Sequence, residues 1–108
     1  MARNFDQDQL EQLAGGDKAF EKELLQLFVR DTENSLIQLE TAITAENPSA
    51  VKELAHYIKG ASANVGAEAL SRVAAQLESL AKAGNLKTAQ GSLRKMQILH
   101  QEVKRMAR

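Results

Sequence analysis

Apolar residues recur along this chain at intervals of three and four, and four short clusters of glycine, proline and asparagine interrupt the pattern. Such intervals place side chains on one face of an α-helix, whereas a half-buried strand needs strict alternation, which no segment shows. The chain is also rich in Leu, Ala, Gln, Glu and Lys, all good helix formers. The sequence therefore predicts an all-α protein.

The first half of the chain predicts a short helix followed by a long one. The short helix covers about residues 5–13 and ends at Gly15 and Gly16, which tolerate the left-handed conformation that stops a helix. Asp17 then caps the long helix, which covers about residues 18–45. The expected core-facing stripe of the long helix comprises Phe20, Leu24, Leu27, Phe28, Leu36, Leu39 and Ile43.

The second half predicts three more helices. Pro48 suits the first position of a helix capped by Asn47, and Gly66 stands just past its C-terminus. A fourth helix follows; Gly84 then closes it and Asn85 opens the last helix. Short connections between long helices favour an antiparallel, up-and-down four-helix bundle, with the N-terminal helix covering one end.

Length and charge limit what the chain can bind. Its 108 residues are enough for one core, so residues 1–108 are expected to form a single domain. The 14 basic and 14 acidic residues cancel, which gives no general attraction to nucleic acid or to an anionic membrane. The chain lacks cysteine, a signal peptide and a long apolar run, so we expect a cytoplasmic protein, and the balanced charge favours a monomer.

One face of the third predicted helix is exposed and contains a histidine. At about 100° per residue, His56 lies opposite the expected core-facing residues of this helix. Those core-facing residues are Leu54, Ile58 and Val65, flanked by Val51 and Ala61. Small and basic residues lie within about 60° of His56. They are Ser49, Lys52, Lys59, Gly60 and Ala63.

Gly60 is unexpected in the middle of a helix, where glycine costs about 1 kcal/mol relative to alanine. In one explanation another element of the same chain, such as the first helix, crosses there in close contact. In the other, the face is left open for a partner. Lys59 favours the second explanation, because it lies one turn from His56 and can reach an anion held at the imidazole.

The stretch AHYIKGASANVG, from Ala55 to Gly66, resembles the motif of the histidine-containing phosphotransfer (HPt) domains of multistep two-component signalling. The resembling pattern is a histidine, two residues, Lys-Gly, small residues and a further glycine at the helix end. The likeness extends over the whole chain, through LLQLFVRDTENSLIQLETAI before the motif and GAEALSRVAAQLESLAKAGN after it.

The resemblance implies a phosphoryl carrier without an autonomous catalytic site. His56 would accept the phosphoryl group, Lys59 would help to neutralise it, and Gly60 would make room for the partner. The implied partners are receiver domains of a hybrid histidine kinase and of a response regulator. No cofactor is expected on this chain, because the Mg²⁺ ion and the catalytic carboxylates would belong to the receiver.

A hydrogen bond to one imidazole nitrogen would orient the other. Residues about ten positions beyond the turn at Gly66 lie across from His56 in an antiparallel pair of helices, which makes Gln76 and Glu78 the candidates. Glu78 fits the position of the family better, although a solvent-facing acid is the simpler interpretation.

Other polar and aromatic residues have simpler explanations. Tyr57 either packs at the edge of the core or adds area to an interface, and Ser62 is expected to bond back to a carbonyl. Asn64 is interpreted as a polar residue of the last turn, and His100 as a half-buried histidine rather than a second site.

Three other classes of protein compete with this interpretation. A helical-bundle metalloprotein needs two inward Glu-x-x-His pairs, and the single pair ending at His56 faces outward. The dimerisation domain of a histidine kinase would have two helices per chain and a following ATP-binding domain. A non-catalytic helical adaptor is the main alternative, because the bundle alone would support it.

Overall fold

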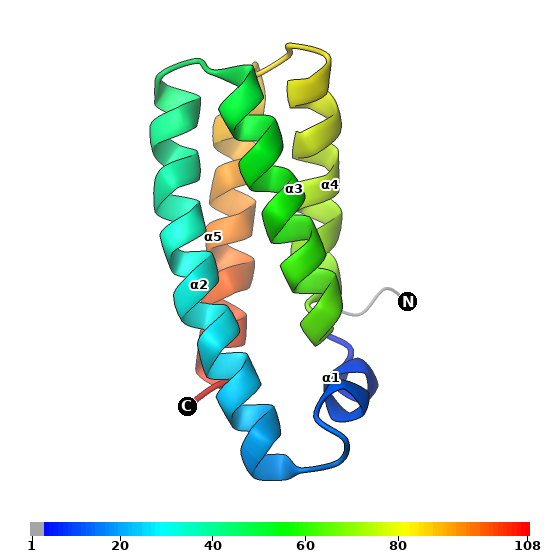
Figure 1. The fold of residues 1–108 in the computed structure, drawn as a ribbon. Helices are drawn as coiled ribbons and strands as arrows, with labels where there is room; N and C mark the ends of the chain where they lie inside the picture. The colour runs from blue at the N-terminus through cyan, green and yellow to red at the C-terminus, as the bar shows by residue number, and fades with distance from the viewer. Residues whose placement is uncertain (1–3) are drawn as a thin grey trace.

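The computed structural model describes residues 4–108, so the first three residues of the predicted domain lie outside the described range. The helices are α1 (Gln7–Leu13), α2 (Lys18–Thr44), α3 (Pro48–Val65), α4 (Glu68–Lys82) and α5 (Ala89–Met106). The four long helices run antiparallel to their chain neighbours, and α1 lies beside one end of the bundle (Figure 1). Residues 4–108 contain no strand, which confirms the predicted fold class.

Helix ends follow the predicted capping signals. The side chain of Asp17 accepts a hydrogen bond from the Phe20 backbone N–H at 3.1 Å, and Asn47 caps α3 through the Ala50 N–H at 3.2 Å. Gly66 has φ +92° and ends α3 in the left-handed conformation. Local signals therefore place these three ends correctly.

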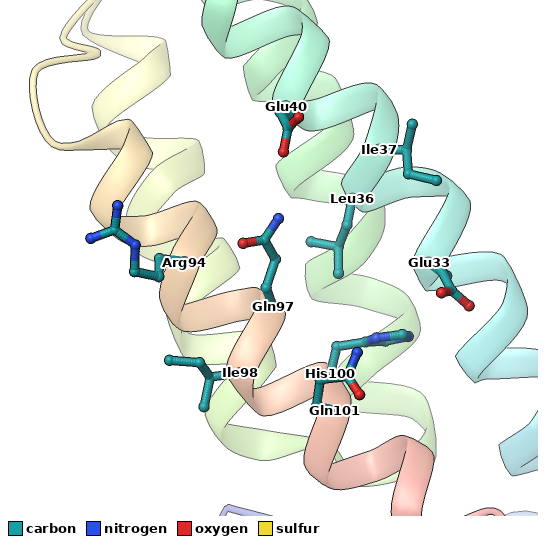
Figure 2. Close-up of a pocket in the computed structure, with 9 residues that line it drawn as sticks. All are labelled: Glu33, Leu36, Ile37, Glu40, Arg94, Gln97, Ile98, His100 and Gln101. Atoms are coloured by element: carbon teal, nitrogen blue, oxygen red, sulfur yellow. The ribbon is translucent and has the colours of Figure 1, made fainter.

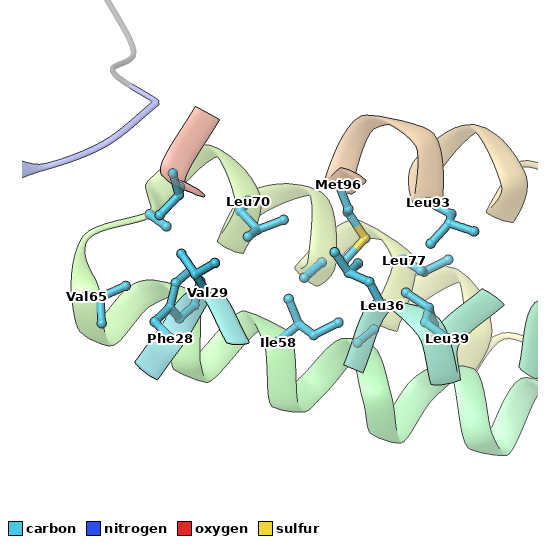
Figure 3. Close-up of a cluster of buried hydrophobic side chains, with 14 of the residues drawn as sticks. Phe28, Val29, Leu36, Leu39, Ile58, Val65, Leu70, Leu77, Leu93 and Met96 are labelled. Carbon is cyan, nitrogen blue, oxygen red and sulfur yellow. The ribbon is translucent and has the colours of Figure 1, made fainter. Parts of the chain in front are cut away.

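The core lies along the axis of the bundle, with α3 packed most extensively on α4, and α2 on both α3 and α5 (Figure 3). Its largest fully buried apolar side chains are Leu39, Val51, Ile58, Leu70, Leu77 and Met96. Among residues 4–108, no helix combines the length and apolar character needed to cross a membrane.

The predicted core stripe of α2 is wrong at its N-terminal end. Phe20 is 42% exposed and Leu27 is 55% exposed, and Leu24 is only partly buried. The buried row there is Glu21, Leu25 and Phe28. At 27 residues, α2 is longer than the 18-residue α3, and its first turns extend past the end of α3 (Figure 1). The neighbouring helices therefore cover only one of its two apolar rows.

The predicted start of the last helix is also wrong, because α5 begins at Ala89 rather than near Asn85. The Asn85 side chain accepts a hydrogen bond from the Lys87 N–H at 3.1 Å, which closes a local turn instead of a helix. An asparagine oxygen stabilises both structures, so the residue type did not distinguish them. Leu86 still packs against the core from this turn.

The buried stripe of α3 is rotated from the predicted one. Ala55 and Ser62 are fully buried, whereas Leu54 and Ala61 are only partly buried. The expected bond from Ser62 to a carbonyl is absent: its buried hydroxyl has no hydrogen-bond partner among residues 4–108. The rotation arises because α4 and α2 together cover α3, which shifts the centre of burial towards the small residues between them.

The segment before α1 is attached to the turn between α3 and α4. The Asp6 N–H donates to the Gly66 carbonyl at 2.6 Å, and the Ala69 N–H donates to the Asn4 carbonyl at 3.1 Å. A Cβ atom at Gly66 would overlap the backbone carbonyl of Asp6. Two constraints therefore require glycine at position 66: the positive φ and the close approach of another backbone segment.

Gly66→Ala should destabilise the protein by about 3 kcal/mol, the sum of a left-handed backbone and a steric overlap. Gly84→Ala is a matched control, because Gly84 has φ +74° but open space around it. The control should cost only about 1 kcal/mol. Urea unfolding measures both variants, and equal losses would contradict the proposed role of the Asp6 contact.

Candidate functional site

His56 projects from the outer face of α3, where its side chain is 67% exposed. Its helix neighbours Ala55 and Ile58 are buried in the core, which fixes the orientation of this face. The helical period therefore predicts the direction of the histidine correctly.

Glu78 of α4 connects His56 to Lys59. One carboxylate oxygen lies 2.8 Å from His56 Nδ1, and the other lies 2.7 Å from the Lys59 ammonium. An ionised carboxylate only accepts hydrogen bonds, so Nδ1 is the protonated nitrogen, and in the neutral ring Nε2 has the lone pair. No partner for Nε2 occurs among residues 4–108. The arrangement leaves the outer nitrogen free and nucleophilic.

The carboxyl group of Glu78 is held in its ionised form. The hydrogen bond from Lys59 is the largest cause of its lowered pKa, partial burial opposes this effect, and the bond from His56 adds to it. Because the pKa is lower in the folded state than in the unfolded one, these contacts stabilise the fold at neutral pH. That contribution is lost as the pH falls through the lowered pKa.

The space beside Gly60 is open. Apart from its own helix backbone and its two chain neighbours, a Cβ atom at Gly60 would meet no atom of residues 4–108 within 4 Å. The explanation that another element of this chain crosses there, such as the first helix, is therefore wrong. The glycine leaves an unobstructed surface one turn from His56.

A shallow hollow of about 350 Å³ borders His56 on its other side. It is lined by Lys52, Glu53, His56, Glu78 and Lys82. Neither Lys52 nor Lys82 has an ion pair or a side-chain hydrogen bond within the described chain. Sequence reasoning missed Lys82, although it lies one turn beyond Glu78 on the same face of α4. Side chains of a helix lean towards its N-terminus, which directs Lys82 towards Glu78.

The other candidate residues lie apart from this cluster. Gln76 is exposed and makes no hydrogen bond with His56, so Glu78 is the residue that binds the ring. Tyr57 is 51% exposed and its hydroxyl donates to Asp31 of α2, so it is not a core-edge residue. Asn64 is exposed, as expected for the last turn of α3.

His100 is buried, more deeply than the half-buried state expected for it, and its Nε2 donates to the Val29 carbonyl at 2.8 Å. It lies at a groove between α2 and α5 (Figure 2). The groove is lined by Glu33, Leu36, Ile37, Glu40, Arg94, Gln97, Ile98, His100 and Gln101. No residue of α3 or α4 lines it, so it is separate from the His56 cluster.

The first turns of α2 leave apolar surface on one face, where Phe20 and Leu27 are exposed and Leu24 is partly buried. Phe20, Leu24 and Leu27 are three or four residues apart, so they lie on one face of α2. Asp31 follows one turn later on the same face. Because Asp31 binds Tyr57, this face lies on the α3 side of α2. Phe20 and Leu27 thus supply exposed apolar surface on α2, a signal that sequence reasoning had assigned to the core.

Lys59→Ala should raise the pKa of the Glu78 carboxyl, because the bond from Lys59 is the main cause of its lowering. A ¹³C NMR titration of the Glu78 side chain measures the change. Lys52→Ala is the matched control: it removes a lysine that makes no bond to Glu78, and it should leave the titration nearly unchanged. Equal pKa shifts in the two variants would show that the positive charge of the surroundings, and not the hydrogen bond from Lys59, keeps Glu78 ionised.

Comparisons with known proteins agree with one another. The family model described as "Hpt domain" matches residues 23–108. The phosphorelay intermediate protein rdeA of Dictyostelium discoideum is 32% identical over 88 residues, which make up 82% of this chain and 35% of that protein. The chain thus spans about a third of the length of this curated relative.

Solved structures match almost the whole chain. The histidine-containing phosphotransfer protein B of Pseudomonas aeruginosa PAO1 superposes with a TM-score of 0.91 at 30% identity, over 99% of this chain and 93% of that one. The HPT domain of a sensor hybrid histidine kinase from Shewanella gives a TM-score of 0.76 at 14% identity, over 96% and 90%. The second similarity concerns the fold alone.

Proposed function

Because this chain belongs to the Hpt domain family, we propose that it accepts a phosphoryl group on His56 and passes it on as an intermediate of a phosphorelay. The observation that supports this function best is an exposed imidazole whose Nδ1 is bound to Glu78 and whose Nε2 is free. A nucleophile that must meet the active site of another protein has to be exposed. It also needs a defined tautomer, which the carboxylate supplies.

The proposed reaction is a direct phosphoryl exchange between two proteins. Nε2 attacks the phosphorus of an aspartyl phosphate on a receiver domain; the Nε2–P bond forms and the P–O bond to the aspartate breaks. The bonding electrons stay with the aspartate, which leaves as a free carboxylate. Such a transfer depends on alignment and on neutralised charge rather than on covalent machinery. We therefore assign the Mg²⁺ ion and the catalytic carboxylates to the receiver and a carrier role to this chain.

Lysines beside His56 suit the charge of the product. A phosphoryl group brings nearly two negative charges at neutral pH. The Lys59 ammonium is already held next to the imidazole by Glu78, and Lys52 and Lys82 border the adjacent hollow without a partner among residues 4–108. Lys59 would thus neutralise part of the added charge without taking part in bond formation.

The surface around His56 suits a protein partner. Gly60 lets a second backbone approach closely, and Phe20 and Leu27 add exposed apolar area on α2. Apolar patches rimmed by polar groups are typical of interaction sites. We assign this surface to receiver domains of a hybrid histidine kinase and a response regulator, and we propose that the chain acts as a cytoplasmic monomer.

His56→Gln should abolish phosphorylation. The wild-type protein, incubated with a phosphorylated receiver domain, should gain phosphate that is labile in acid and stable in base. A panel of labelled receivers, followed by gel autoradiography, measures the transfer, and His100→Gln serves as the control histidine. If no receiver labels the wild-type protein, or if label persists in His56→Gln, the carrier function is wrong and the adaptor remains.

Gly60→Gln should slow transfer by about tenfold or more, because fitting a side chain into a close interface costs on the order of 1–3 kcal/mol. The fold should become slightly more stable, by about 0.5 kcal/mol, since glutamine favours helix over glycine.

Gly91→Gln is the matched control for this change. Gly91 lies in α5, and a Cβ atom there also meets open space, but it is outside the His56 cluster. The control should gain similar stability and transfer phosphate at the wild-type rate. Equal transfer rates in the two variants would refute the proposed use of Gly60.

A further inference from the structure

We propose that Glu78 keeps the proton on His56 Nδ1 after phosphorylation, so that the phosphorylated ring stays a cation and remains ready to release its phosphoryl group. This inference rests on the proposed function and concerns the second half of the exchange. It gives Glu78 a role beyond orienting the unmodified imidazole.

The bonding of the ring explains why this proton matters. Forming the Nε2–P bond uses the lone pair of Nε2, so the product is an imidazolium that still has its Nδ1–H. If that proton is lost, the phosphoryl group can leave only by expelling an imidazole anion, which is a very poor leaving group. If the proton stays, the group that leaves is a neutral imidazole.

Imidazole itself titrates near neutral pH, so an unassisted phosphorylated ring would be partly deprotonated in the cell. Glu78 opposes this loss, because its oxygen lies 2.8 Å from Nδ1. A hydrogen bond between a cationic N–H and a carboxylate is about twice as strong as a neutral one. The contact should therefore be stronger in the phosphorylated protein than in the unmodified one.

The carboxylate cannot easily turn away from the ring. Its second oxygen is bound to Lys59 at 2.7 Å, and its side chain is only 21% exposed. A single carboxylate thus joins the nucleophile to the Lys59 ammonium, and both of its oxygens are engaged.

The other charged groups near the ring have a smaller effect on its proton. Lys52, Glu53 and Lys59 come from α3, and Lys82 comes from α4. On α2, Asp31 is bound to Tyr57 rather than to the histidine. The lysines disfavour a cationic ring, but the phosphoryl group adds nearly two negative charges for them to face. The carboxylate in direct contact with Nδ1 is then the group that decides whether the proton stays.

Both steps of the exchange balance without a proton from solvent. In the first, Nε2 gains the phosphoryl group while Nδ1 keeps its proton. In the second, a receiver aspartate attacks the phosphorus, the Nε2–P bond breaks, and its electron pair returns to Nε2. The ring is then neutral with a proton on Nδ1, as it began.

Glu78→Gln separates orientation from proton retention. Glutamine has the same shape, and its amide oxygen can still accept from Nδ1–H, so the unmodified ring stays oriented. It has no charge, however, and its amide nitrogen can donate to a deprotonated Nδ1 instead. The variant should therefore accept a phosphoryl group but hold the proton less tightly afterwards.

The test uses phosphoramidate, a small donor that needs no partner protein. Wild type, Glu78→Gln, Glu78→Ala and Glu53→Gln are phosphorylated on His56, and the Nδ1 proton is titrated by ¹⁵N NMR. Glu53 is the matched control, because it lines the same hollow without a bond to His56. An opposite charge in contact shifts a titration by about 1–3 pH units. Wild type and Glu53→Gln should thus deprotonate at least about one unit above Glu78→Gln.

Transfer from the phosphorylated proteins to a receiver, followed from pH 6 to pH 9, gives a second measurement. As the pH rises, the transfer rate should begin to fall at a lower pH in Glu78→Gln than in wild type. In Glu78→Ala the rate should begin to fall at a pH at least as low as in Glu78→Gln. Superimposable titrations of wild type and Glu78→Gln would overturn the inference. Failure of His56 to react with phosphoramidate would overturn it as well. Phosphorylated protein that titrates as expected but exchanges with no receiver would support the inference and refute the proposed function.

Discussion

Close packing of α3 on α4 is the constraint on which the His56 cluster depends. Ala55 of α3 and Ala74 of α4 are completely buried, and such small side chains let two helices approach closely. The Ser71 hydroxyl donates to the Lys59 carbonyl at 3.0 Å and adds a polar contact to the same seam. A 2.8 Å contact between His56 and Glu78, which are 22 positions apart, is possible only if this register is fixed.

The turn at Gly66 sets that register. Its left-handed backbone ends α3, and the strand-like segment at Asp6 lies across it and bonds to its carbonyl. A residue with a side chain would have to move the turn or displace Asp6. The glycine at the end of the motif therefore acts on the distant imidazole through the pairing of two helices, while Gly60 acts at the surface itself. Gly60 and Gly66 therefore stand in the same stretch of sequence for different physical reasons.

Much of this arrangement could be predicted from local signals. Caps and stop residues located most helix ends, and the helical period alone gave the outward direction of His56. Counting across the turn narrowed the orienting group to Gln76 and Glu78, but side-chain geometry was needed to choose between them. Phe20 and Leu27 were misplaced because periodicity shows that a face is apolar, not that a neighbour covers it. Lys82 was missed because it lies far from the motif in the chain and becomes a neighbour only through tertiary packing.

A phosphoryl acceptor that must enter another protein's active site cannot be buried, and this limits how its chemistry can be tuned. Burial and a low dielectric, the strongest means of shifting proton affinity, are not available to a side chain with this exposure. What remains is a direct hydrogen bond from a neighbouring helix and cations on long, flexible side chains. Glu78 supplies the first, and Lys59 supplies the second while also keeping Glu78 ionised. The bundle core thus influences the reaction indirectly, by holding one carboxylate at a fixed distance from an exposed ring.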